Sequence, residues 1–172
     1  MNFDKLIETR YSCRSYTDEE ISDEDLQAVL NAARLAPTAA NRQAYKLVVI
    51  HTAGREEEIS RIYGREWFVQ APIIIAACGI PADNWTSSNG KSYTDVDVAI
   101  VLDHLILAAA DRGLGTCWIA AFDPYAVREI LELPIGVDPI VLTTLGHPAD
   151  SGKSKLRKDL ADIVCYEKWE EK

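Results

Sequence analysis

The sequence has no long apolar run and no excess of positive charge. Its longest apolar stretch, residues 73–80, has the length of a strand and is far too short to span a membrane. The formal net charge is −9, from 18 Lys and Arg against 27 Asp and Glu. Proteins that bind nucleic acid or anionic membranes need a basic face. We therefore expect no nucleic-acid partner and no membrane.

Closely spaced cysteine pairs, which zinc sites usually require, are also missing. The four cysteines are far apart: Cys13, Cys78, Cys117 and Cys165. The first residues, Met1 to Lys5, lack the apolar core of a secretion signal. We therefore expect no metal site, a cytoplasmic location, and reduced thiols that are mostly buried.

The chain has 172 residues, of which 48% are hydrophobic and 26% charged, and this balance predicts one folded domain over residues 1–172. Apolar spacing and Gly and Pro positions indicate strands that alternate with helices. The expected strands are 47–50, 73–78, 116–120 and 139–145. The expected helices are 3–9, 22–36, 54–63, 67–71, 95–112, 124–131 and 159–164. This alternation predicts an α/β or α+β domain with a central sheet.

Residues 10–16 have no helical period and read as an extended segment. Arg10, Ser12 and Arg14 alternate, so in an extended chain their side chains point the same way. Two guanidiniums and a hydroxyl match the hydrogen-bonding needs of a phosphate. The pattern also fits a solvated surface segment with incidental charges.

A polar turn follows the helix that Pro37 ends. Thr38, Asn41 and Gln43 carry neutral groups that both donate and accept hydrogen bonds. Such groups can read sugar hydroxyls or the pyrimidine edge of a flavin. An ordinary turn at a helix C-terminus would use the same residue types.

Residues 113–122 lead from a helix into a strand through Gly113 and Gly115. Ile119, Ala120 and Ala121 offer small side chains and free backbone groups, against which a flat ring could lie. A plain core strand is the alternative. The G-x-G here ends a helix instead of following a strand, so we reject a Rossmann dinucleotide site.

The tail places two cations, Lys155 and Arg157, two residues apart. In an acidic chain, this pair and the arginines at 10 and 14 are among the few concentrations of positive charge. A dianionic phosphate would suit both groups, whereas a basic surface turn would need no ligand.

Together these segments resemble the FMN-binding pattern of the nitroreductase family. The shared motifs are R-x-S-x-R at 10–14, P-[ST]-x-x-N-x-Q at 37–43, G-L-G-T-x-W-I at 113–119, and G-x-P followed by K-x-R within 146–157. They cover nearly the whole chain. Thr38 stands where many relatives have serine, and Ala44 and Tyr45 replace a proline and a tryptophan. The chain is short for the family, and we expect it to lack the helical insertion of larger members.

The resemblance implies an α+β (α/β-like) fold with a central mixed sheet flanked by helices. It also implies an intertwined homodimer with two FMN sites at the interface. One subunit would hold the phosphate and ribityl chain with Arg10, Tyr11, Ser12, Arg14, Lys155 and Arg157. The other subunit would contribute Pro37, Thr38, Asn41 and Gln43. Ile119, Ala120 and Ala121 would lie along the flavin ring, with a backbone N–H near N5.

The activity implied is that of an FMN-dependent oxidoreductase with a ping-pong mechanism. It would pass hydride from NADH or NADPH to an electron-poor small molecule such as a nitroaromatic, a quinone or an enone. FMN carries the chemistry, so no catalytic side chain is required. Arg14 is the candidate to stabilise the reduced, anionic flavin. The alternatives are a flavin-binding or sensory module without turnover, flavin fragmentation or dehalogenation, and an interaction domain without a cofactor.

Overall fold

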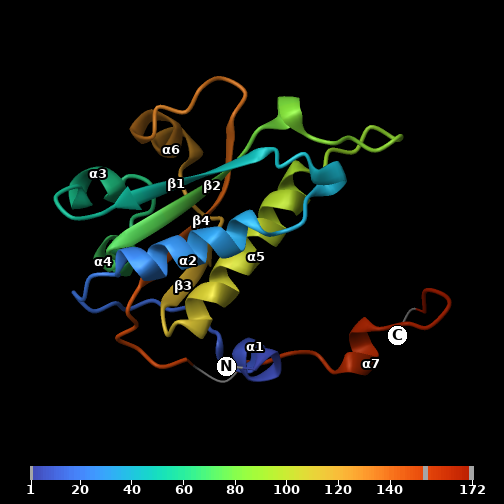
Figure 1. The fold of residues 1–172 in the computed structure, drawn as a ribbon, viewed down its shortest axis with the longest axis horizontal. Coiled ribbons are helices and arrows are strands. Elements are labelled where there is room, and N and C mark those ends of the chain that lie inside the picture. Colours follow the sequence, from blue (N-terminus) through green and yellow to red (C-terminus); the bar gives the residue numbers. More distant parts are fainter. Residues whose placement is uncertain (1, 153–154, 171–172) are drawn as a thin grey trace.

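The computed structural model describes residues 2–152 and 155–170, and residues 1, 153–154 and 171–172 lie outside this described part. Its strands are β1 (Tyr45–His51), β2 (Ile73–Gly79), β3 (Gly115–Ile119) and β4 (Asp138–Gly146). Its helices are α1 (Phe3–Thr9), α2 (Asp23–Arg34), α3 (Glu56–Ser60), α4 (Glu66–Gln70), α5 (Thr94–Asp111), α6 (Pro124–Ile130) and α7 (Leu160–Ile163). Short 3-10 turns occur at Ala39–Asn41 and Pro81–Asp83. The α+β fold class is confirmed (Figure 1).

The sheet has four strands in the order β1-β2-β4-β3, and neighbouring strands are antiparallel. The helix α5 joins β2 to β3, which run in the same direction, but β4 inserts between them with the opposite direction. This insertion explains why a strand–helix–strand pattern did not produce a parallel ladder. In the described residues, parallel pairing is confined to an isolated bridge between Ser12 and Thr116. The mixed sheet that we expected is therefore antiparallel in its four strands.

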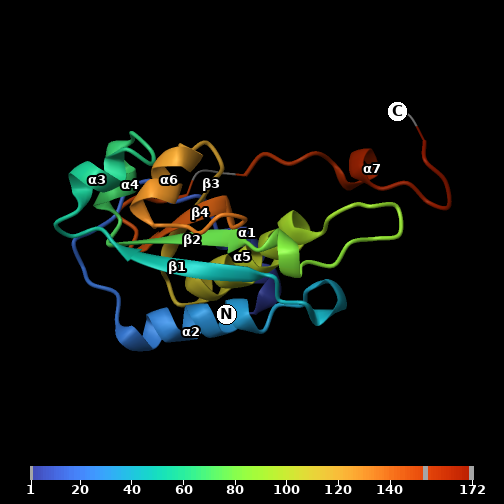
Figure 2. The ribbon, with the colours of Figure 1, turned by 90° about the horizontal axis from the view of Figure 1, so that it is seen from above.

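Helices cover both faces of the sheet because β2 is apolar on both sides. Alternate residues of a strand point to opposite faces, and every residue of β2 is buried. Ile73 and Ile75 pack with α2 and α5 on one face. Ile74 and Ala76 pack against the short helices α3, α4 and α6 on the other. Figure 2 shows the resulting layers, with α2 on one side of β1 and β2 and with α3, α4 and α6 on the other.

Local signals explain some of the helix ends. The Ser22 hydroxyl accepts the Asp25 N–H at 3.1 Å and starts α2, as expected of an N-cap. The helix expected over residues 54–63 is shorter, Glu56–Ser60. Gly54 adopts φ = +75°, a left-handed conformation that keeps it out of the helix. Among the described helices, none combines the length and the apolar character needed to cross a membrane.

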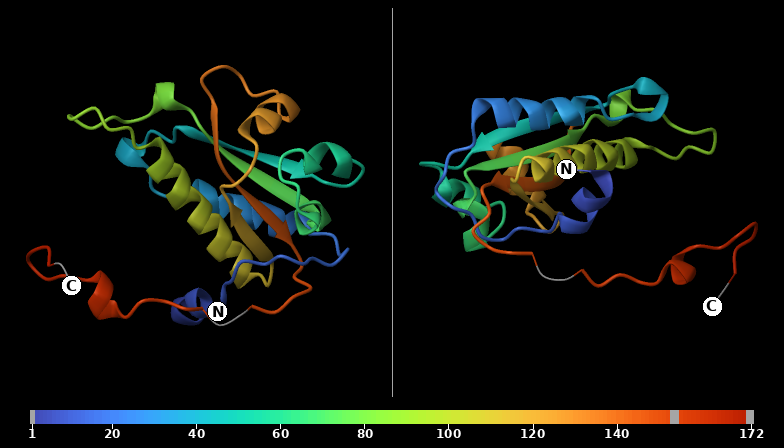
Figure 3. Two further views of the ribbon diagram at one scale, coloured as in Figure 1. Left: turned by 180° about the vertical axis from the view of Figure 1, so that it is seen from behind. Right: turned by 60° about the horizontal axis from the view of Figure 1, so that its bottom comes forward.

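The chain leaves the body after β4 and continues as a tail that carries α7 (Figures 2 and 3). The large apolar side chains of this tail are mostly exposed: Leu156, Leu160, Ile163, Tyr166 and Trp169. All four cysteines are free thiols. Three of them are buried as expected, whereas Cys165 in the tail is exposed.

Candidate functional site: a cationic pocket beside the edge strand

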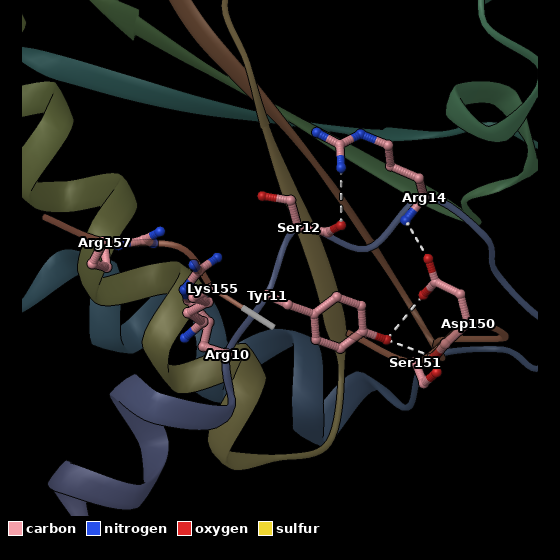
Figure 4. Close-up of a pocket in the computed structure, with 8 residues that line it drawn as sticks. All are labelled: Arg10, Tyr11, Ser12, Arg14, Asp150, Ser151, Lys155 and Arg157. Atoms are coloured by element: carbon pink, nitrogen blue, oxygen red, sulfur yellow. Dashed lines mark hydrogen bonds between the residues drawn. The ribbon is translucent and has the colours of Figure 1, made fainter. Parts of the chain in front are cut away.

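A cavity of about 360 Å³ lies where the segment after α1 meets the start of the tail. Its lining residues are Arg10, Tyr11, Ser12, Arg14, Asp150, Ser151, Lys155 and Arg157 (Figure 4). The structure therefore brings together two of the predicted groups, the 10–14 segment and the tail cations. Every residue that the sequence suggested for the phosphate and ribityl chain lines this cavity.

Strand β3 holds the first of these segments in place. Ser12 forms the parallel bridge to Thr116, and the Cys13 N–H donates to the Thr116 carbonyl at 2.9 Å. The close approach requires a glycine at position 115, because a Cβ there would lie 2.7 Å from the Cys13 Sγ. The glycine that we expected to serve a tight turn thus also lets the predicted phosphate segment lie against the sheet.

Three of the cations share one end of the pocket: Arg10, Lys155 and Arg157 (Figure 4). The Lys155 Nζ donates to the Ile7 carbonyl at 2.6 Å, at the end of α1. Burial, and then the charges of Arg10 and Arg157, lower the pKa of Lys155. None of the ion pairs in the described residues involves these three cations. Glu8 opposes the fall in the Lys155 pKa, and Glu8 and Asp103 line an adjoining groove with the same three cations. The cluster thus has more positive than negative charge and forms no ion pair among the described residues, which suits an anion site.

Arg14 is held apart from this cluster. Its Nη1 donates to the Ser12 carbonyl at 3.3 Å, and its guanidinium carbon lies 5.8 Å from the centre of the Trp67 ring. Figure 4 shows its guanidinium bent back over Ser12, apart from the side chains of Arg10, Lys155 and Arg157. Burial raises the pKa of the Cys117 thiol in β3, and Arg14 and Arg10 are among the groups that oppose this rise. Arg14 thus lies outside the cation cluster.

Sequence reasoning missed an acidic residue of the pocket, Asp150. The Tyr11 hydroxyl donates to the Asp150 backbone carbonyl at 2.7 Å and to its Oδ1 at 2.9 Å. The Arg14 N–H donates to the Asp150 Oδ2 at 3.2 Å. The sequence feature that could have revealed it is the position of this single acidic residue, two residues after Pro148 and directly before the basic tail.

The predicted turn lies at the other end of α5. Its Ala39 N–H donates to the Oδ1 of Asp97, a residue in the first turns of α5 that is 2% exposed. Ala110, near the end of the same helix, lines a groove together with Arg10. With a rise of about 1.5 Å per residue, the stretch of α5 from Asp97 to Ala110 is about 20 Å long. Arg10, Lys155 and Arg157 also line a groove with Asp103 and Leu107 in the middle of α5, and no residue of the turn lines either cavity.

Three residues of this turn adopt left-handed backbone angles, which the sequence did not indicate. They are Ala40, Asn41 and Gln43, with φ of 49°, 54° and 52°. Such angles are costly for residues other than glycine and need support from their surroundings. The Thr38 hydroxyl supplies part of it by accepting the Gln43 N–H at 3.0 Å. Pro37, Asn41 and Gln43 are exposed at this end of the molecule.

The third predicted segment follows β3 away from the pocket. Ile119 is buried in the sheet, whereas Ala120 and Ala121 are exposed beyond its end. Because β3 is an edge strand, its outer side is available for backbone contacts where no strand pairs with it. The bridge at Thr116 places the beginning of this strand beside the cationic pocket. In the described residues, no group of three or more His, Cys, Asp or Glu is arranged to hold a metal ion.

The fold and the pocket define an α+β protein with a cationic pocket beside an edge strand. The sequence profile of the nitroreductase family matches residues 7–65 and 56–147. The chain belongs to this family. The crystal structure of a nitroreductase family protein from Clostridium difficile 630 superposes with a TM-score of 0.89 at 38% identity, covering 98% of this chain and 100% of that one.

Two curated relatives are similar over most of their length. A protein of Archaeoglobus fulgidus, provisionally named NADH dehydrogenase/NAD(P)H nitroreductase, is 31% identical over 96% of this chain and 97% of its own. The FMN reductase [NAD(P)H] of Bacillus subtilis is 31% identical over 89% of this chain and 68% of its own.

Proposed function

We propose that this chain is an FMN-dependent oxidoreductase that takes hydride from NADH or NADPH and reduces an electron-poor small molecule. The observation that carries the proposal is the cluster of Arg10, Lys155 and Arg157, three cations in one pocket that form no ion pair among the described residues. Family membership and the names of the relatives support the same activity.

The pocket fits one part of FMN. A cavity of about 360 Å³ is at the lower end of the range of small-molecule pockets, enough for the phosphate and sugar-alcohol chain. The exposed Ala120 and Ala121 beyond β3 offer a flat, uncrowded surface for the ring. When bound, FMN supplies the hydride chemistry, and the protein supplies binding, orientation and electrostatics.

Each part of the site has a distinct task in this proposal. Arg10, Lys155 and Arg157 neutralise the phosphate, and Ser12 adds a neutral hydrogen bond. Tyr11 forms one wall of the pocket, and its hydroxyl is already engaged by Asp150. The backbone that follows Ile119 lies along the ring.

Arg14 belongs to the electrostatics of the ring in this proposal. Its guanidinium lies over Ser12, outside the cation cluster, and its charge opposes the rise in the pKa of Cys117 in β3, the strand that leads to the ring surface. A fixed positive charge on that side favours the reduced, anionic form of a flavin.

We further propose that the protein is a homodimer and that each flavin contacts both subunits. The turn with Pro37, Thr38, Asn41 and Gln43 lines neither of the cavities that the three cations share, so the second copy supplies it to the flavin. The exposed apolar residues of the tail, including Leu160, Ile163 and Trp169, support such a pairing because they have little to pack against in their own chain.

Donor and acceptor use the same flavin in turn, so the proposal predicts ping-pong kinetics. Nitroaromatics, quinones and enones are the acceptors to test. We also propose that the protein acts in the cytoplasm. The experiment is purification with added FMN, followed by NADH or NADPH oxidation with each acceptor. We expect a yellow protein and parallel lines in double-reciprocal plots. A yellow protein without turnover would instead indicate a binding or sensory module, and a colourless protein that ignores FMN would overturn the proposal.

A further inference from the structure

A carboxylate beside an anion site is unexpected, because it repels the anion. Asp150 lines the cationic pocket, yet it pairs with none of the guanidinium or ammonium groups there. The hydrogen bonds to its carboxylate come from the segment Tyr11 to Arg14. The donors are the Tyr11 hydroxyl at 2.9 Å, the Cys13 thiol at 3.2 Å and the Arg14 N–H at 3.2 Å. The hydroxyl and the thiol share their protons with backbone carbonyls, those of Asp150 at 2.7 Å and Ser15 at 3.1 Å.

These donors stay protonated at neutral pH. Burial, and then the hydrogen bond to Asp150, raise the pKa of Tyr11. Burial raises the pKa of Cys13 to about 11. The Tyr11 ring also lies against Gly152, where a Cβ would come within 2.7 Å of its Cγ. Tyr11 is thus fixed by its hydroxyl and by its ring to the start of the tail.

We propose that Asp150 is the positioning residue of the phosphate pocket. It fixes the segment from Tyr11 to Arg14 so that Arg10 and Ser12 present their donors to one phosphate. The inference rests on the proposed function, since the phosphate is that of FMN. The hydrogen bonds of Asp150 strengthen phosphate binding, by positioning the segment, more than its negative charge weakens it.

The two effects of Asp150 predict opposite results for Asp150→Asn, which makes the test sharp. Removal of a repelling charge alone would tighten FMN binding. Loss of positioning weakens it, because an amide nitrogen replaces one of the two acceptor oxygens. We expect the dissociation constant of FMN, measured by flavin fluorescence quenching, to rise about tenfold, which corresponds to about 1.4 kcal/mol. Riboflavin, which lacks the phosphate, should lose much less affinity.

Two further variants separate positioning from charge. Tyr11→Phe removes one donor to Asp150 without a change in charge, and we expect FMN affinity to fall about threefold. Asp159→Asn removes the same charge from the tail outside the pocket and should leave FMN affinity unchanged.

The outcomes distinguish this inference from the proposed function. If the wild-type protein binds no FMN, the proposed function fails and this inference falls with it. If the wild type binds FMN while Asp150→Asn binds it equally well or more tightly, the positioning role of Asp150 is wrong and the proposed function stands. Should Asp150→Asn not fold by circular dichroism, Asp150→Glu decides, because it keeps the charge and displaces the acceptor oxygens; an unchanged FMN affinity in that variant overturns the inference.

Discussion

At the scale of single residues, the four predicted phosphate cations do not act alike. The alternation of Arg10, Ser12 and Arg14 suggested one common target, because alternate side chains of a strand share a face. The structure pairs this segment with β3 at Ser12 alone, so the backbone is not a regular strand. Arg10 joins the tail cations, and Arg14 stacks on Trp67. The residue types were predictable from the sequence, but the direction of each side chain depended on contacts distant in the chain.

Replacing Arg14 should change the midpoint potential of the flavin rather than the binding of its phosphate. In Arg14→Ala, the reduced, anionic flavin loses a stabilising charge, so we expect the midpoint potential to fall by about 30–60 mV, where 30 mV of a two-electron couple is about 1.4 kcal/mol. Spectroelectrochemistry on the FMN-bound protein measures this. Arg34→Ala, which removes an exposed guanidinium at the end of α2, is the control. A potential equal to that of the wild type would remove Arg14 from this role.

One ion pair gives the fold a defined acid sensitivity. Asp25 in α2 contacts the Arg112 guanidinium at the end of α5 at 2.6 Å. The hydrogen bond from Arg112, followed by that from Ser22, holds the pKa of Asp25 below its usual value. A carboxyl group with a lowered pKa stabilises the fold above its unfolded-state pKa. That stability is lost as the pH falls through the folded-state pKa.

Asp25→Asn should therefore lower the stability of the fold at neutral pH and leave it unchanged in acid. We expect the melting temperature to drop by about 1–3 °C at pH 7. The gap to the wild type should close as the pH falls below about 4, where the unfolded-state carboxyl protonates. Differential scanning calorimetry across this pH range measures the gap, with Asp23→Asn in the same helical turn as the control. A gap that persists at low pH would show that charge is not the cause.

At the scale of elements, the position and type of most helices and strands followed from the sequence, whereas their pairing did not. The apolar residues of β2 alternate between two buried faces, and this pattern appears directly in the sequence as a strand-sized apolar run. Which strand lies beside which is decided by residues far apart. No local sequence pattern predicts the insertion of β4 between β2 and β3. The left-handed turn at Ala40 was equally hidden, because alanine does not signal a positive φ.

The contact between the phosphate segment and the sheet depends on a missing side chain at position 115. In Gly115→Ala the new Cβ would lie 2.7 Å from the Cys13 Sγ and 2.8 Å from its Cβ. We expect a loss of about 1–3 kcal/mol in the free energy of unfolding, as for other overpacked sites. FMN binding should also weaken, because the segment moves away from β3. Urea unfolding and FMN titration measure the two effects.

A second glycine provides the matched control for this substitution. At Gly64 a new Cβ meets nothing within 4 Å, and the backbone angle is not left-handed. Gly64→Ala should therefore leave both the unfolding free energy and FMN affinity close to those of the wild type. If Gly115→Ala were as mild as this control, the close approach of Cys13 would not be needed for the site.

At the scale of the whole molecule, the site is divided between two distant parts of the chain. The polar turn lies near the beginning of α5, whereas the cations of the pocket lie beside its middle and its end. The sequence predicted both sets of residues but could not tell how far apart folding places them. Two copies of the chain, arranged with two-fold symmetry, can bring the turn of one copy to the pocket of the other. Each contact in such an interface occurs twice, so both pockets receive a turn from the partner.

Mixing two defective variants tests this arrangement directly. Arg10→Ala impairs the pocket, and Asn41→Ala impairs the turn. In a mixed dimer, one site combines both defects, and the other combines the intact pocket of the Asn41→Ala chain with the intact turn of the Arg10→Ala chain. Random exchange of subunits should therefore restore about a quarter of the wild-type FMN sites, measured by flavin content after gel filtration. Each variant unfolded and refolded alone is the control. If the mixture binds no more FMN than the separate variants, each site is built from a single chain and the shared-site dimer is wrong.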